Sequence, residues 1–411
     1  MRQNKSNFGK FLLLWAGELI SSIGWGLTSF GLGVYIFDKT GSAANMALVT
    51  LLGFLPSLLL SVPAGVLADR YDRRLLMIIG DGCSALGIIY IFICMKNGGA
   101  TLTQICIGVF VSSVFSALLE PSFRATITEL LTKDEYSKAS GLVSMAGSAR
   151  YLFSPVIAGL LLTVSDVSLL IMIDICTFVL TVICAAVVRK SIGHRETAGS
   201  RISFIHSLKE GWIILREKKG VLLLVIVSSG ITLFMGMFQI LAEPMILSFS
   251  DAKTLGIAET ICACGMLVSG LILGVRGLKG HYVGTLAAAF ILSGLFMSGF
   301  GIFEKITPIC IFGFLFFAAL PVCNNCLDYL MRTNIPEQAQ GRAWGLIGLI
   351  SQLGYVVAYA ISGSAADAIG RATGLGVGRG SAAVIIFAGI CMAVNAAVIL
   401  IPRSIRELES N

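Results

Sequence analysis

Charged residues are scarce in this sequence. Asp, Glu, Lys and Arg together make up 13% of its 411 residues, whereas a soluble domain contains about a quarter. Apolar residues make up 56%, and the mean hydropathy is +0.89. A surface with so little charge would not stay in water, so the composition excludes a soluble protein and predicts an all-α integral membrane protein.

Motifs that carry catalysis are also missing. The sequence contains no G-x4-G-K-[ST], no H-E-x-x-H and no G-x-S-x-G, so ATP hydrolysis, metalloprotease and lipase activities are not expected. Cys323 and Cys326 form a C-x-x-C, but inside an apolar stretch and without two further ligands. We therefore expect no enzyme activity, no cofactor and no metal site.

Twelve apolar stretches are each long enough to cross a bilayer as a helix. They lie near residues 11–37, 43–67, 75–95, 102–127, 139–164, 167–188, 221–248, 255–275, 282–303, 306–331, 343–369 and 381–402. Six precede and six follow a basic polar segment. This predicts an N-terminal six-helix bundle at 1–190, a cytoplasmic linker at 191–219 and a C-terminal six-helix bundle at 220–411.

The linker has an apolar pattern of its own. Phe204, Leu208, Trp212 and Leu215 recur at helical spacing, which is typical of an amphipathic helix on the membrane surface. A solvated tether with one or two helical turns is the alternative interpretation.

The net charge of +7 comes from basic residues placed between the apolar stretches. The termini and the even-to-odd loops hold 23 of the 30 Lys and Arg residues. Positive charge accumulates on the cytoplasmic side of membrane proteins. This predicts a multi-pass protein of the bacterial cytoplasmic (inner) membrane with both termini in the cytoplasm, and it explains the charge without a nucleic-acid partner.

The two halves resemble each other. Lys138–Leu142 and Arg342–Leu346 are similar and lie 204 residues apart, and Gly65 and Gly270 lie 205 residues apart at equivalent positions. Two matches at nearly one offset indicate a parallel internal repeat, as in transporters built from two six-helix halves.

The loop after the second stretch carries the most specific motif. Residues 65–74 read GVLADRYDRR, which resembles the loop 2–3 signature G-x-L-x-D-R-x-G-R-R of the major facilitator superfamily, with Asp72 in place of a glycine. The resemblance implies a cytoplasmic latch between the two halves, in which Asp69 faces the start of the eleventh helix near Gly341–Gly345. The latch residues are Gly65, Asp69, Arg70, Arg73 and Arg74.

The fifth stretch resembles the antiporter signature of exporters in this superfamily, G-x8-G-x3-G-P-x2-G-G. The matching helix-packing residues are Gly141, Ser154, Pro155, Ala158 and Gly159. Arg150 stands where the signature has a glycine. Small residues permit close helix contact, so ordinary packing is the alternative explanation for this pattern.

Three further segments resemble the macrolide-efflux branch of the superfamily, to which the siderophore exporters are near relatives. They are Leu14–Glu18, Lys39–Ala43 and Gly53–Pro56. The resemblance implies a monomeric exporter of small, largely apolar compounds that works by proton antiport and alternating access in the lipid bilayer. Two alternatives remain open: a lipid, lysophospholipid or siderophore exporter of the same fold, and a non-transporting membrane sensor or immunity partner.

Ionisable residues inside a bilayer cost about 2.5–3.5 kcal/mol each on insertion scales, so they are candidates for function. In this fold spans 1, 4, 7 and 10 line a central cavity, which places Glu18, Glu120, Glu243 and Asp328 on cavity helices. The predicted coupling and substrate-cavity residues are Glu18, Glu120, Arg150, Asp174, Asp328, Asn324, Asn325, Trp25, Phe234 and Met237. Arg150 is expected to neutralise Glu18 or Glu120, and Asp81 is expected to be structural.

Overall fold

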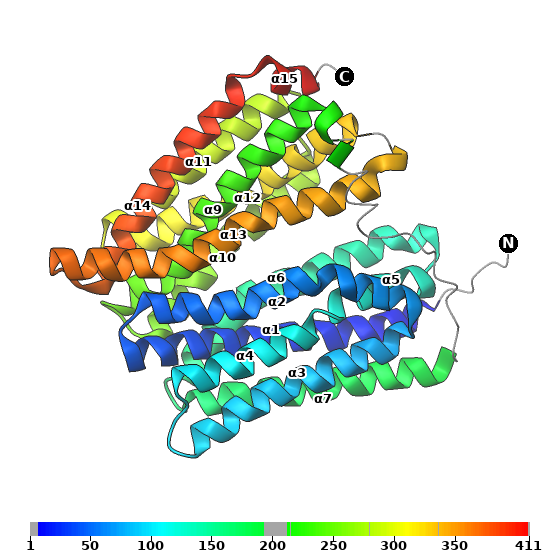
Figure 1. The fold of residues 1–411 in the computed structure, drawn as a ribbon, viewed down its shortest axis with the longest axis vertical. Helices are drawn as coiled ribbons and strands as arrows, with labels where there is room; N and C mark the ends of the chain where they lie inside the picture. The colour runs from blue at the N-terminus through cyan, green and yellow to red at the C-terminus, as the bar shows by residue number, and fades with distance from the viewer. Residues whose placement is uncertain (1–6, 193–211, 214, 279, 336, 410–411) are drawn as a thin grey trace. The chain divides into compact units, whose positions relative to one another are not determined.

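The computed structural model describes residues 7–409 except 193–211, 214, 279 and 336. Over these residues the chain is all-α (Figure 1). Eleven of the described helices are long and apolar enough to cross a membrane. This confirms the all-α membrane class, while the expected total of twelve spans and the orientation of the termini stay predictions.

The chain forms two compact units. The first unit comprises Met1–Asp38 and Val49–Arg201, and the second comprises Lys39–Leu48 and Ile202–Asn411. The first contains most of α1 (Phe8–Thr40) and α2 (Ala43–Arg70), with α3 (Arg73–Lys96), α4 (Leu102–Ser116), α5 (Leu119–Leu130), α6 (Tyr136–Leu161) and α7 (Val167–Ile192). The second contains α9 (Lys219–Leu247), α10 (Ala252–Arg276), α11 (Tyr282–Ile302), α12 (Ile306–Asn334), α13 (Glu337–Thr373), α14 (Gly376–Ala397) and α15 (Arg403–Arg406).

Glycines on one face of α1 determine how the first unit packs. Gly17, Gly24 and Gly31 repeat every seven residues and face α7. A Cβ atom at Gly24 would lie 2.5 Å from Thr177 Oγ1, and one at Gly31 would lie 2.7 Å from a methyl group of Leu170. Since only glycine fits at these distances, the stripe lets α1 approach α7 closely, as small residues do in membrane helix pairs.

Aromatic side chains fill the interior of the second unit. Phe238 of α9 lies against Phe300 of α11 and Phe316 of α12, with ring centroids 4.8 and 4.6 Å apart. In addition, α9 packs on α13 and α14, and α12 packs on α10 and α11. The first unit has no comparable aromatic cluster among its described residues.

Local signals explain several helix ends. Thr101 and Gln104 form a capping box at the start of α4. Asp251 begins α10 by accepting a hydrogen bond from the Thr254 amide at 2.8 Å. The helix ends at Gly277, whose φ of 64° favours glycine.

The expected fourth span is confirmed as one of the eleven candidates, at Leu102–Leu130, but its helix and the expected fifth span differ in detail from the sequence-based prediction. The fourth is not one continuous helix, because α4 ends at Ser116 and α5 begins at Leu119. Pro121 lacks the amide that would bond to the carbonyl four residues earlier, so the helix is interrupted there. The fifth forms helix α6, but α6 is not among the eleven apolar candidates, since it contains Arg150 and many small residues.

Most of the predicted linker, including Phe204 and Leu208, lies outside the described residues. Trp212 is exposed and Leu215 is buried within short helical turns. The amphipathic helix therefore stays a prediction.

Candidate functional site

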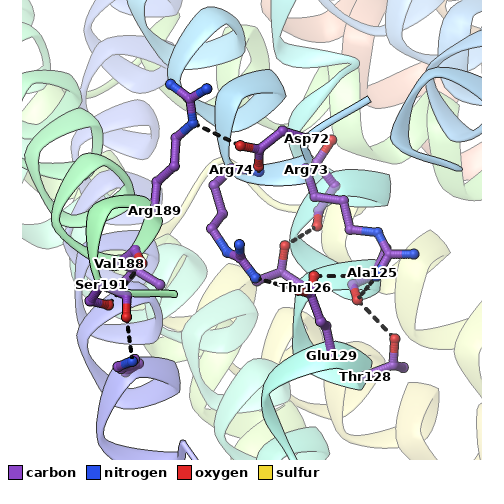
Figure 2. Close-up of polar contacts among 12 residues, drawn as sticks. Asp72, Arg73, Arg74, Ala125, Thr126, Thr128, Glu129, Val188, Arg189 and Ser191 are labelled. Atoms are coloured by element: carbon purple, nitrogen blue, oxygen red, sulfur yellow. Dashed lines mark hydrogen bonds and ion pairs between the residues drawn. The ribbon is translucent and has the colours of Figure 1, made fainter. Parts of the chain in front are cut away.

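The junction between α2 and α3 holds a network of charged side chains (Figure 2). Asp72 caps α3, because its carboxylate accepts a hydrogen bond from the Arg74 amide at 3.0 Å. Arg189, near the end of α7, places its Nε atom 2.7 Å from the other Asp72 oxygen. The aspartate that replaces the signature glycine thus gains both a capping role and an ion pair.

These contacts set the charge of Asp72. Burial by itself raises the pKa of the Asp72 carboxyl. The hydrogen bonds from Arg189 and from the Arg74 amide, together with the Arg189 charge, outweigh burial and lower this pKa below its ordinary value. Asp72 is therefore ionised at neutral pH.

Glu129 of α5 binds the two arginines that end the motif. Its carboxylate lies 2.7 Å from Arg74 Nη2 and 3.7 Å from Arg73 Nη1. Arg73 also donates to the Ala125 carbonyl at 2.8 Å, and Arg74 is buried. We call Asp72, Arg73, Arg74, Glu129 and Arg189 the junction cluster. The sequence motif did not point to Glu129, whose role depends on the packing of α3 on α5.

The other three latch residues do not join this cluster. Asp69 and Arg70 are exposed at the end of α2. No described atom lies within 4 Å of a Cβ position at Gly65. The predicted counterpart near Gly341–Gly345 belongs to the second unit, and its side chains lie outside the described ones. The latch role of these three residues stays a prediction.

The small residues of α6 pack against α1. Ser154 donates to the Ile23 carbonyl at 3.0 Å, and a Cβ atom at Gly26 would lie 2.3 Å from Ser154 Oγ. Three other motif residues are buried: Pro155, Ala158 and Gly159. Gly141 is exposed, with no atom within 4 Å of a Cβ position. Gly26 completes this contact, although its place in the sequence gave no signal.

Arg150 binds aromatic rings. Its guanidinium carbon lies 4.3 Å from the Trp25 ring centroid and 4.5 Å from that of Tyr151, whose hydroxyl it also hydrogen-bonds. None of the ion pairs among the described residues joins Arg150 to Glu18 or Glu120, so the neutralising role expected for it is not seen. Trp25 remains 42% exposed.

Four predicted carboxylates have different surroundings. Glu120 is exposed and pairs with Arg124 at 2.8 Å, while Glu18 is half-buried and interacts electrostatically with Glu120. Asp174 is completely buried in α7. Asp328, in the second unit, is exposed and lies 3.1 Å from Arg332.

The remaining predicted cavity residues lie in the second unit. Asn324 and Asn325 are exposed on α12, Phe234 is half-buried on α9, and Met237, the residue before Phe238, is buried. Glu259 of α10 was missed, although it lies inside an apolar stretch and interacts electrostatically with Glu243 of α9.

Asp367 of α13 makes the best-defined polar contact of the second unit, and the sequence motifs did not point to it. Its carboxylate accepts from Ser42 Oγ at 2.6 Å, from the Ala43 amide at 2.9 Å and from the Ala44 amide at 3.2 Å. It therefore caps the first turn of α2, whose start belongs to the second unit. Next to it, a Cβ atom at Gly363 would lie 2.5 Å from the Ala43 carbonyl.

Comparison with known proteins agrees with this architecture. The family model described as Major Facilitator Superfamily matches residues 14–359. Macrolide efflux protein A of Streptococcus pyogenes is 28% identical over 375 residues, covering 88% of this chain and 90% of that protein. The staphyloferrin A transporter of Staphylococcus aureus is 25% identical over 293 residues, covering 70% of each chain.

Solved structures share the fold. A POT family transporter in complex with 5-aminolevulinic acid superposes with a TM-score of 0.76 at 13% identity, covering 97% of each chain. A bacterial homologue of the iron transporter ferroportin in the inward-facing state gives a TM-score of 0.72 at 12% identity, covering 96% of this chain and 100% of that one. At such low identity these likenesses establish the fold alone.

Proposed function

Because the chain belongs to the major facilitator superfamily, we propose that it is a secondary transporter that exports small, largely apolar compounds of the macrolide type by proton antiport and alternating access. The observation that supports export most directly is the similarity to macrolide efflux protein A over 88% of this chain. In this proposal the protein lies in the bacterial inner membrane, and the substrate leaves the cytoplasm in exchange for protons.

The junction cluster supports one part of this mechanism. Arg73 and Arg74 hold α3 against α5 through Glu129, and Asp72 ties the start of α3 to the end of α7 through Arg189. These contacts fix the end of α2, where Asp69 and Arg70 stay exposed. We propose that this rigid end presents Asp69 to the second unit when the cytoplasmic side closes.

Asp367 supports the opposite part of the cycle. Its negative charge sits at the N-terminus of α2, where the helix dipole and the unpaired amides favour an anion. In this proposal, opening of the outer side separates the first turn of α2 from Asp367, and water then replaces the carboxylate at the freed amides. The contact therefore stabilises the outward-closed state.

Exposed side chains of the predicted cavity are suited to an apolar substrate with a polar group. Trp25 offers a partly exposed ring backed by Arg150. Asn324 and Asn325 offer amides, while Glu120 offers a carboxylate that could take a proton or attract a cationic amine. We assign substrate contact to these residues as part of the proposal.

Drug susceptibility and dye efflux in an efflux-deficient bacterial host test the function. Cells that make the protein should tolerate more erythromycin and lose dye faster than cells that make the Glu120→Gln variant, and a protonophore should remove the difference. Export that is unaffected by the protonophore would refute proton antiport. No resistance and no efflux across a broad drug panel would refute drug export.

Siderophore export is the second candidate, because the staphyloferrin A transporter is 25% identical over 70% of this chain. Accumulation of the siderophore in the cytoplasm of a siderophore-producing strain that lacks the protein, together with unchanged drug tolerance, would favour it.

A further inference from the structure

We propose that Asp174, Asp81 and Thr28 form a proton-binding site inside the first unit, between α7, α3 and α1. Its use in coupling rests on the proposed function. Asp174 and Asp81 are 0% and 4% exposed, and Thr28 is 3% exposed. All three residues therefore lie in the interior of the helical unit.

The backbone of α1 seals the site. A Cβ atom at Gly24 would lie 2.9 Å from Asp174 Oδ1 and 2.5 Å from Thr177 Oγ1. Thr177 donates to the Asp174 carbonyl at 2.7 Å and lies 3.4 Å from Asp174 Oδ1. Asp81 interacts with the side chain of Thr181 one turn further along α7.

Two polar atoms of this site have no hydrogen-bond partner among the described residues. They are Asp174 Oδ2 and Thr28 Oγ1, although the two side chains lie next to each other. A buried polar atom without a partner costs roughly 1–3 kcal/mol, and a charged one costs more. The Thr28 hydroxyl carries its own proton and can pair with the Asp174 carboxyl in either protonation state, so what a proton on Asp174 removes is the buried charge, which no ion pair among the described residues offsets.

No cation competes for this role. Neither aspartate takes part in an ion pair among the described residues. Arg150 of α6, the basic residue inside the fifth predicted span, binds the rings of Trp25 and Tyr151 with its guanidinium. The described residues contain no group of three Asp, Glu, His or Cys side chains that could hold a metal ion.

Other polar groups of the first unit lie near the site. Asp81 interacts electrostatically with both Asp174 and Glu18, and Glu18 interacts with the exposed Glu120. Ser84, about one turn after Asp81 on α3, is buried, and its hydroxyl lies 2.7 Å from Ser112 Oγ of α4.

Infrared spectroscopy of the purified full-length protein in detergent tests proton binding without any substrate. At neutral pH the wild-type protein should show the carbonyl band of a protonated carboxyl. Asp174→Asn should lose the component of this band that belongs to Asp174, and Thr28→Val should shift that component because the hydrogen-bond partner of the carboxyl is gone. Asp166→Asn, which removes an exposed loop carboxylate, is the matched control and should keep the band. A band that persists unchanged in both Asp174→Asn and Asp81→Asn would overturn the proposal, as would its loss when sodium replaces potassium.

Transport in proteoliposomes tests whether the bound proton is used. With radiolabelled erythromycin as the probe, Asp174→Asn should lose gradient-driven accumulation at least tenfold but keep substrate exchange without a gradient, since the amide mimics the protonated state. Accumulation at the wild-type rate would overturn the coupling role. If the wild-type protein does not transport erythromycin while the infrared band behaves as expected, the proposed substrate fails and the proton site stands. Monodispersity on size-exclusion chromatography shows that each variant is folded.

Discussion

Asp367 holds the first turn of α2 with three hydrogen bonds, of 2.6, 2.9 and 3.2 Å. Its removal in Asp367→Ala leaves the Ala43 and Ala44 amides without an acceptor. Loss of a helix cap costs about 0.5–2 kcal/mol, and loss of a negative charge at a helix N-terminus costs about 0.3–1 kcal/mol. The two losses together should destabilise the closed state by about 1–3 kcal/mol, which makes separation of the first turn of α2 from α13 roughly 5- to 150-fold more frequent.

Cysteine labelling measures this separation. Met46, one turn into α2, is 5% exposed, so a Met46→Cys reporter in a background without the eleven native cysteines reacts only when the contact opens. Under conditions in which opening is rapid, an impermeant maleimide should label Asp367→Ala about tenfold faster than the parent. Asp367→Asn keeps one acceptor oxygen and should give an intermediate rate.

Asp251→Ala is the matched control, because Asp251 also caps a helix of the second unit, α10, but does not contact α2. It should leave the labelling rate at position 46 unchanged. Equal labelling rates for Asp367→Ala and the parent, or an equal increase for Asp251→Ala, would refute the claim that Asp367 holds the first turn of α2 in the closed state.

Three further predictions concern the first unit. Arg74→Ala removes the closest ion-pair partner of Glu129, and because breaking a buried pair costs about 3–5 kcal/mol, the variant should unfold in detergent at a clearly lower temperature. Arg124→Ala is the control, since it removes an exposed pair and should cost at most about 1 kcal/mol. Equal effects of the two substitutions would contradict the burial argument. Because the pKa of Asp72 is lowered in the folded protein, its ion pair contributes stability above the ordinary carboxyl pKa of about 3.9 and loses it as the pH falls through the lower folded value. Asp72→Asn should therefore weaken the fall of stability with acid, and an unchanged pH profile would contradict the shift. Gly26→Ala places a Cβ atom 2.3 Å from Ser154 Oγ and should lower the free energy of unfolding by about 1–3 kcal/mol, part of which Ser154→Gly should restore. Gly141→Ala is the control, because a Cβ atom there meets no other atom within 4 Å. A loss of stability at Gly141 as large as at Gly26 would contradict the packing argument.

The sequence was sufficient to place most helices, because a bilayer imposes a long apolar stretch on every span. The junction motif was also recognisable, since its arginines and Asp72 are neighbours in the chain. The break between α4 and α5 was not predicted, although Pro121 was a local signal for it. Apolar length alone does not show an interruption that leaves the overall span intact.

Partners that are distant in the chain could not be predicted. Glu129 binds Arg74 only because α5 folds back onto α3, and Asp367 meets Ser42 across 325 residues of sequence. Asp81 was expected to be structural, and its closeness to Asp174 follows from the packing of α3 on α7. These roles depend on which helix faces meet, which hydropathy does not determine in helices that are apolar all round.

Accumulation of radiolabelled erythromycin in inside-out membrane vesicles tests the central claim of drug export most directly. Vesicles that contain the protein should accumulate the drug when their interior is made acidic, and accumulation should stop when a protonophore collapses the gradient. Accumulation no greater than in vesicles without the protein, at every gradient applied, would contradict macrolide export by this chain.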